Sequence, residues 1–228
     1  MKLSKLFAFV AVFGILSFTM MQTNPVFYII GDSTVRNGDG SGRNGQWGWG
    51  SFMAGYFDTT KISVQNHAIG GRSSRTFITE GRWEKIFGNL KKGDYVIMQF
   101  GHNDAAENKP ERYTNVTAYK EYLRLYVNQT RQKRAIPIIL TPVNRNYPWK
   151  DGTIGNVHGE YPQAVKDVAK ELNVLLIDLQ QLSIDAFAAK GQDYVTQHYF
   201  MNLPAGKYKN YPEGQKDNTH FQPEGALA

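Results

Sequence analysis

Ser33, near the start of the chain, and Asp217 and His220, near its end, have side chains that could act together in nucleophilic catalysis. Ser33, which follows Gly31 and Asp32, offers a hydroxyl group as nucleophile, and His220 offers an imidazole as base. Asp217 stands three residues before His220, a spacing that puts carboxylate and imidazole on the same side of a turn. A serine hydroxyl becomes a useful nucleophile when a base takes its proton and a third group orients that base. The three residues therefore predict acyl-transfer chemistry.

Donors for an oxyanion hole are also present. The backbone N–H groups of Ser33 and Gly71 and the side-chain amide of Asn103 are suited to the oxygen of a tetrahedral intermediate. Each of these motifs alone is an ordinary turn sequence, and Asn103 is equally suited to hold its own backbone. Their combination, in order along the chain, favours an enzyme.

The elements expected to position these residues alternate between strand and helix. Apolar runs predict strands over residues 26–30, 62–68, 95–100, 136–140 and 174–179. Helical spacing of apolar residues predicts helices over residues 74–90, 117–134, 161–172 and 182–189. This alternation predicts an α/β fold, a three-layer α/β/α sandwich around a five-stranded parallel sheet. Ligands of such sheets bind beyond the carboxyl ends of the strands, and Ser33, Gly71 and Asn103 all follow predicted strands.

The motifs resemble the four sequence blocks of the SGNH hydrolases, also called GDSL-type esterases. Residues 31–34, 66–75, 101–104 and 217–220 are similar to the four blocks in order. The resemblance is closest to rhamnogalacturonan acetylesterases, through Arg72 and Arg75 in the second block, a Gly-rich loop around Trp47, and Thr141-Pro142. It implies a flavodoxin-like SGNH fold with Ser33 as nucleophile, His220 as base and Asp217 as its orienting group. It also implies an oxyanion hole of Ser33, Gly71 and Asn103, and no cofactor.

By this resemblance the protein is expected to be a secreted serine esterase that removes O-acetyl groups from rhamnogalacturonan or another plant cell-wall polysaccharide. One alternative is a GDSL-type lipase, lysophospholipase or short-chain acyl esterase, which needs an apolar acyl groove. The loops here offer Gly, Asn, Arg and Trp instead. Another alternative is a non-catalytic carbohydrate-binding protein of the same fold, which the presence of all five site residues disfavours.

Three residues are predicted to contact the sugar: Arg72, Trp47 and His198. A guanidinium group matches a uronate carboxylate, and an aromatic face in a loop can stack on a sugar ring. Arg72 and Arg75 are equally suited to brace the second loop through backbone contacts. Both interpretations remain open at this point.

Composition removes several other classes. The 228 residues include no Cys, so disulfides, thiolate metal sites and a cysteine nucleophile are excluded. No H-E-x-x-H pair is present, and we expect no metal site. The net charge of +6 is compatible with an acidic partner, but no basic stripe indicates nucleic acid. An acetylated polysaccharide or oligosaccharide is the expected partner of a monomeric protein.

The two ends of the chain carry further expectations. Lys2 and Lys5 precede residues 6–21, of which 13 of 16 are apolar, a pattern typical of a signal peptide. We expect a signal peptide over residues 1–22, a secreted or periplasmic protein with no membrane partner, and one SGNH hydrolase domain over residues 23–228. Residues 223–228 resemble only the start of the family's last helix, which is therefore expected to be truncated.

Overall fold

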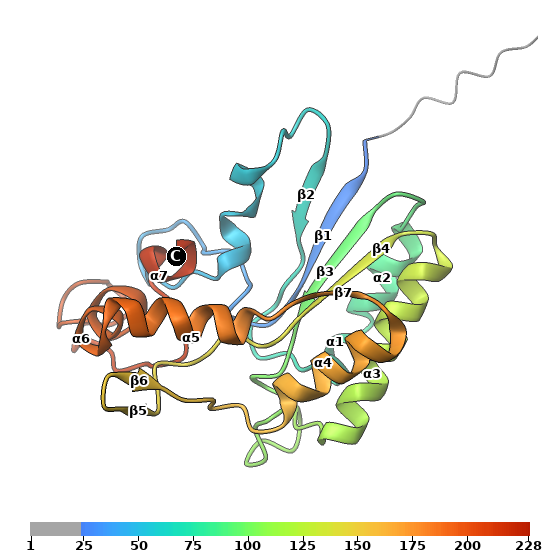
Figure 1. The fold of residues 1–228 in the computed structure, drawn as a ribbon. Helices are drawn as coiled ribbons and strands as arrows, with labels where there is room; N and C mark the ends of the chain where they lie inside the picture. Colours follow the sequence, from blue (N-terminus) through green and yellow to red (C-terminus); the bar gives the residue numbers. More distant parts are fainter. Residues whose placement is uncertain (1–23) are drawn as a thin grey trace, which may run out of the picture.

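A five-stranded parallel sheet lies at the centre of the structure, a computed structural model that describes residues 24–228 (Figure 1). The predicted signal peptide, residues 1–22, lies outside the described residues. The strands are β1 (Val26–Gly31), β2 (Ser63–Asn66), β3 (Tyr95–Gln99), β4 (Ile136–Leu140) and β7 (Leu175–Ile177). Their spatial order is β2-β1-β3-β4-β7, the flavodoxin-like order, so the predicted fold class is confirmed.

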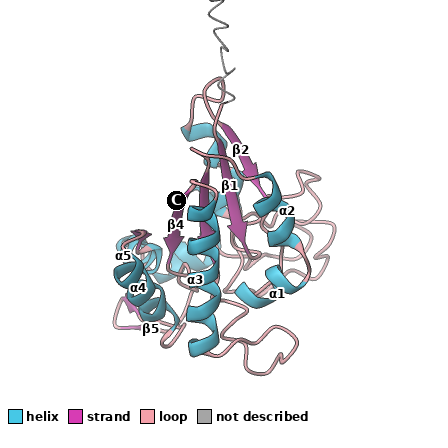
Figure 2. Cartoon of the chain, turned by 90° about the vertical axis from the view of Figure 1, so that its right-hand side faces the viewer, coloured by secondary structure: helices cyan, strands magenta, loops and turns pink. Residues whose placement is uncertain are grey.

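Both faces of the sheet are covered, which explains why the strands are continuous apolar runs. In β1, Tyr28 and Ile30 point to one face, while Phe27 and Ile29 point to the other. The first face packs against α1 (Ser74–Thr79), α2 (Arg82–Asn89), α3 (Val116–Gln132) and α4 (Tyr161–Leu172), the helical layer seen in Figure 2. Two short 3-10 helices, Trp49–Ser51 and Met53–Tyr56, and the start of α5 (Leu179–Lys190) pack against the other face.

The predicted helix over residues 74–90 is in fact two helices. Gly81, with φ of 70°, adopts the left-handed conformation that glycine tolerates best, and it turns the chain between α1 and α2. Ser73 begins α1 by accepting a hydrogen bond from the backbone N–H of Thr76. Apolar spacing alone does not detect this break, because the periodicity resumes in α2. The other predicted helices agree with the structure to within a few residues.

Several short elements beyond the sheet were not predicted. They are the hairpin of β5 (Trp149–Lys150) and β6 (Thr153–Ile154), α6 (Gln192–Tyr194) and a π-helical turn over Val195–Tyr199. The helical start expected over residues 223–228 is present as α7 (Pro223–Leu227). Most of these elements pack around an apolar cluster apart from the sheet, called here the second apolar cluster, which includes Phe187, Phe200 and Phe221. None of the helices described between residues 24 and 228 is long and apolar enough to cross a bilayer.

The contact between α1 and α3 gives a test of the helical layer. The buried Tyr126 hydroxyl group donates a hydrogen bond of 2.8 Å to the Ser74 carbonyl oxygen. We expect Tyr126→Phe to lower the free energy of unfolding by about 1–2 kcal/mol in urea denaturation, because this buried bond is lost. Tyr122→Phe, on the same helix, is the matched control and is expected to change it by less than about 0.5 kcal/mol. Equal effects of the two changes would contradict the assignment.

Candidate active site

The predicted site residues gather at the carboxyl edge of the sheet. Ser33 follows β1, Gly71 follows β2 and Asn103 follows β3. The strand order reverses between β1 and β3, and such switch points form the ligand-binding crevice of open parallel sheets. A cavity of about 720 Å³ lies there, lined by Ser33, Gly71, Asn103 and His220 among others. The topology thus brings residues from distant segments around one cavity.

Ser33, His220 and Asp217 form a continuous chain of hydrogen bonds. His220 Nε2 lies 2.8 Å from Ser33 Oγ, although 187 positions separate the two residues. His220 Nδ1 lies 2.7 Å from Asp217 Oδ2. With a proton on Nδ1 donated to Asp217, Nε2 is left to accept the proton of the Ser33 hydroxyl group. The geometry therefore suits general-base activation of Ser33.

A turn, rather than a helix, places Asp217 beside His220. Asp217 Oδ1 accepts hydrogen bonds from the backbone N–H groups of Thr219 at 2.8 Å and His220 at 3.0 Å, which closes the turn. Burial alone would raise the pKa of Asp217, but the hydrogen bonds from His220 and Thr219 and the nearby imidazole lower it overall. Asp217 therefore stays ionised and can stabilise a protonated imidazole.

Two neighbouring segments fix the backbone around His220. The Met201 N–H donates to the His220 carbonyl oxygen at 2.9 Å, and the Trp47 N–H donates to the Phe221 carbonyl oxygen, also at 2.9 Å. Phe221 is 2% exposed and belongs to the second apolar cluster. The base is thus anchored by the core residue that follows it.

The three predicted oxyanion donors border the same cavity. A Cβ atom built on Gly70 would lie 3.5 Å from Ser33 Cβ, so the second block packs directly against the first. Gly71 has φ of 79°, a left-handed conformation that favours glycine. One N–H of the Asn103 amide donates to the Arg72 carbonyl oxygen at 3.0 Å, which orients the group and leaves its second N–H for a ligand. The three candidate donors therefore border one cavity, as an oxyanion hole requires.

Buried carboxylates support the loops behind the site. Asp32 is fully buried, and its Oδ1 accepts hydrogen bonds from the N–H and hydroxyl groups of Thr34, whereas its Oδ2 has no partner within residues 24–228. Burial raises the pKa of Asp32 to about 6. Asp104 accepts from Ser74 and the Gly101 N–H, and burial raises its pKa to about 7. Both groups order loops without lining the cavity.

The structure does not bring the three predicted sugar contacts into the cavity. Arg72 donates to Glu80 and to the Gly70 carbonyl oxygen, which fits the bracing interpretation. The Trp47 ring stacks on Phe52 and packs against the second apolar cluster. It therefore contributes to the core and is not among the residues that line the cavity. His198 is exposed and stacks on Tyr194, away from the residues that line the cavity.

Sequence reasoning missed four cations that do line the cavity: Arg36, Lys109, Arg112 and Arg145. They stand in loops that follow β1, β3 and β4, at the catalytic edge. Their positions after predicted strands could have indicated that they lie near the site, but no sequence motif distinguishes them from other surface cations. Within residues 24–228 no group of three or more His, Asp or Glu residues is arranged to hold a metal ion.

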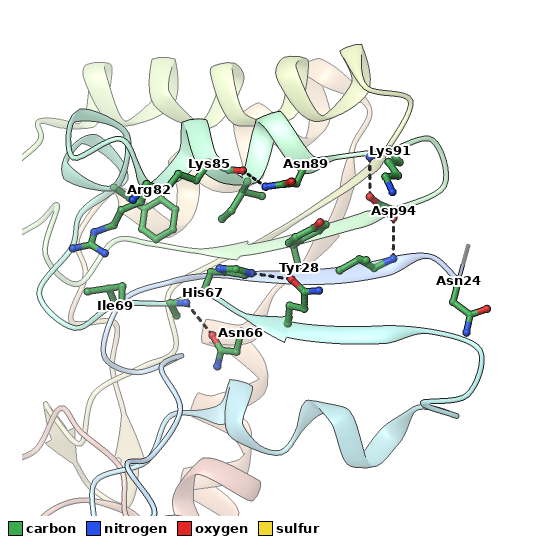
Figure 3. A pocket seen from close by; sticks show the side chains of 15 residues that line it. Asn24, Tyr28, Asn66, His67, Ile69, Arg82, Lys85, Asn89, Lys91 and Asp94 are labelled. Carbon is green, nitrogen blue, oxygen red and sulfur yellow. Dashed lines mark hydrogen bonds between the residues drawn. The ribbon is translucent and has the colours of Figure 1, made fainter. Parts of the chain in front are cut away.

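A second cavity, of about 670 Å³, lies between strands β1 and β2 and helix α2 (Figure 3). Tyr28, His67 and Lys85 line it, but it holds no serine beside a base. Its carboxylate, Asp94, already accepts the backbone N–H groups of Val26 and Lys91, each at 2.8 Å. The cavity at Ser33 is therefore the better candidate for acyl-transfer chemistry.

Known proteins resemble this chain over most of its length. The model of the GDSL-like lipase/acylhydrolase family matches residues 29–227. The chain is 41% identical over 201 residues to a probable rhamnogalacturonan acetylesterase, YesY of Bacillus subtilis, covering 87% of this chain and 86% of that protein. It is 35% identical over 208 residues to the rhamnogalacturonan acetylesterase RhgT of the same organism, covering 91% and 87%.

Solved structures agree in fold. The crystal structure of protein YxiM from Bacillus subtilis has a TM-score of 0.77 at 30% identity and covers 90% of this chain. This chain spans 53%, about half, of that structure. The acetylxylan esterase Axe2 of Geobacillus stearothermophilus has a TM-score of 0.56 at 22% identity, with 72% of this chain and 82% of that one covered.

The buried Asp32 predicts a pH dependence of stability. Its pKa rises from about 4 in the unfolded chain to about 6 in the folded chain, so folding favours the protonated form. The contribution of Asp32 to the free energy of unfolding is therefore greatest below about pH 4 and is lost as the pH rises through about 6. In Asp32→Asn the amide nitrogen can replace the unpartnered Oδ2, and this dependence disappears. We expect the variant to gain up to about 3 kcal/mol relative to the parent protein between pH 4 and pH 7, measured by urea unfolding.

Asp193→Asn, which removes an exposed carboxylate, is the matched control and should follow the parent's pH profile. Identical profiles for Asp32→Asn and the parent protein would show that Asp32 is not the titrating group.

Proposed function

Since the chain belongs to the GDSL-like lipase/acylhydrolase family, the SGNH hydrolases, we propose that it is a serine esterase that removes O-acetyl groups from rhamnogalacturonan or a similar plant cell-wall polysaccharide. The observation that carries this proposal is the hydrogen-bonded arrangement of Ser33, His220 and Asp217 beside an open polar cavity. The two rhamnogalacturonan acetylesterases similar to this chain support the choice of substrate. Carboxylic ester hydrolysis is the activity of this family, and we propose that Ser33, His220 and Asp217 form the catalytic triad that performs it.

The reaction follows from the position of each group. Ser33 Oγ attacks the acetyl carbonyl carbon while its proton moves to His220 Nε2, and Asp217 stabilises the resulting imidazolium. The Ser33 and Gly71 N–H groups and the Asn103 amide hold the oxyanion. The bond to the sugar oxygen then breaks, and His220 returns the proton to that oxygen. Water, activated by His220, hydrolyses the acetyl-enzyme and releases acetate.

Two alternatives are less well supported. A lipase needs an apolar groove at the nucleophile, but the Ser33 cavity is lined by cations, amides and His. The apolar pocket of about 380 Å³ near Phe187 shares none of its lining residues with that cavity. A non-catalytic sugar-binding protein would have no need of the close Ser33–His220 contact.

Substitution of the triad tests the proposal. We expect Ser33→Ala and His220→Ala each to lower the release of acetate from acetylated rhamnogalacturonan by about 10³-fold or more, because no activated nucleophile remains. Asn103→Ala is expected to lower it by about 10²-fold, through the loss of one oxyanion donor. His198→Ala, outside the cavity, is the matched histidine control and should keep the parent rate.

A serine-directed fluorophosphonate should label Ser33, with the adduct located by peptide mass spectrometry. Labelling elsewhere, or full activity of Ser33→Ala, would contradict the mechanism.

We also propose that residues 1–22 direct export, that the mature protein is secreted or periplasmic, and that it acts as a monomer without a cofactor. The basic and then apolar pattern of residues 2–21 supports export. When the full chain is expressed in a bacterial host, we expect a mature N-terminus near residue 23 by N-terminal sequencing. A cytoplasmic protein that retains Met1 would contradict export.

A further inference from the structure

The cavity at Ser33 has a cationic wall, which we define as Arg36, Lys109, Arg112 and Arg145. No Asp or Glu is among the residues that line this cavity. In the whole chain, 20 Asp and Glu residues offset most of the 26 Lys and Arg residues. Around this cavity, by contrast, the four cations have no carboxylate among the lining residues to offset them. A cavity lined by a single sign of charge attracts ligands of the opposite sign. The wall therefore indicates an anionic ligand.

Arg112 lies beside Gly71, one of the proposed oxyanion donors. Its Nη1 would lie 3.3 Å from a Cβ atom built on Gly71. Its Nε is buried and has no hydrogen-bond partner within residues 24–228. The only carboxylate paired with it there, on Glu111, is 3.8 Å from Nε, beyond hydrogen-bond distance, and belongs to a side chain that is 69% exposed. A guanidinium group in this position has donors left over for a ligand.

Neighbouring residues hold the wall in place before any ligand binds. Arg75 Nη2 donates to the carbonyl oxygens of Pro110 at 3.2 Å, Glu111 at 3.0 Å and Tyr113 at 3.1 Å, on both sides of Arg112. Arg145 donates to His102 Nδ1 at 3.3 Å and to the His102 carbonyl oxygen at 3.2 Å. Preorganised donors lose less entropy on binding, which favours a specific contact over a diffuse attraction.

We infer that Arg112 is a specificity-determining residue that binds the carboxylate of a uronic acid in the acetylated substrate. Because Arg112 lies against Gly71, that carboxylate belongs to the acetylated sugar or to the sugar bonded to it. Arg36, Lys109 and Arg145 add attraction for the same acidic chain. The inference rests on the proposed function and adds to it the residue that distinguishes an acidic substrate from a neutral one. Planar guanidinium groups pair with carboxylates through two parallel hydrogen bonds, which a neutral sugar cannot offer.

The test compares two substrates with the purified protein: acetylated oligogalacturonate, which is acidic, and acetylated xylo-oligosaccharide, which is neutral. The quantity measured is the ratio of the kcat/KM values for acetate release from the acidic and the neutral substrate. We expect Arg112→Gln to lower this ratio about tenfold to a hundredfold, mainly through a higher KM for the acidic substrate. Arg112→Lys keeps the charge but loses the two-pronged geometry, and should give an intermediate ratio. Lys92→Gln removes an exposed cation at the opposite edge of the sheet and should leave the ratio unchanged.

A second comparison uses only the unchanged protein, so it does not depend on the variant folding. Methyl esterification of the uronate carboxyl groups should lower the parent's ratio to that of Arg112→Gln. An unchanged ratio in both comparisons, with acetate still released, would overturn the carboxylate contact and leave the proposed function standing. An equal loss on both substrates in Arg112→Gln would also overturn it, by assigning Arg112 to the reaction itself. Failure of the unchanged protein to release acetate from any glycan would overturn the proposed function instead.

Discussion

The imidazole of His220 is the group on which the rest of the site depends, because its two nitrogens must meet two different partners at once. Nδ1 faces Asp217, and Nε2 faces Ser33. The turn at Asp217 supplies the first partner, and the end of β1 supplies the second. Neither segment can shift without breaking one of these hydrogen bonds. The buried Phe221 and the backbone bridges beside it therefore hold the proposed base in position as well as stabilising the fold.

Charge is divided between the two sides of the catalytic loops. Behind them, Asp32 and Asp104 are buried and accept hydrogen bonds from loop N–H and hydroxyl groups. In front, the cationic wall faces the cavity. Burial raises the pKa of both carboxylates behind the loops. The loops are thus ordered by groups that the substrate does not meet.

Local patterns predicted the sheet, most helices and the places of Ser33, Gly71 and Asn103, because apolar runs and strand-end motifs are readable within a few residues. His220 follows no predicted strand, and its place beside Ser33 was expected from the combination of residue types and the family resemblance. The break at Gly81 was missed because the apolar spacing continues across it. Trp47 was assigned to the sugar since its loop is Gly-rich, yet Phe52 and the second apolar cluster cover its ring. The sequence could not single out Arg112 as a candidate substrate contact, because its position beside Gly71 is created only by the tertiary structure.

The sequence distance between Ser33 and His220 has a consequence for folding. Contacts that close a loop of 187 residues are entropically unfavourable until much of the intervening chain is ordered. Four of the five strands of the sheet, β2, β3, β4 and β7, and the whole helical layer of α1 to α4 lie within that loop. Nucleophile and base therefore meet only when nearly the whole domain has assembled. Esterase activity in a refolding experiment would thus report completion of the native topology, whereas helix content would recover earlier.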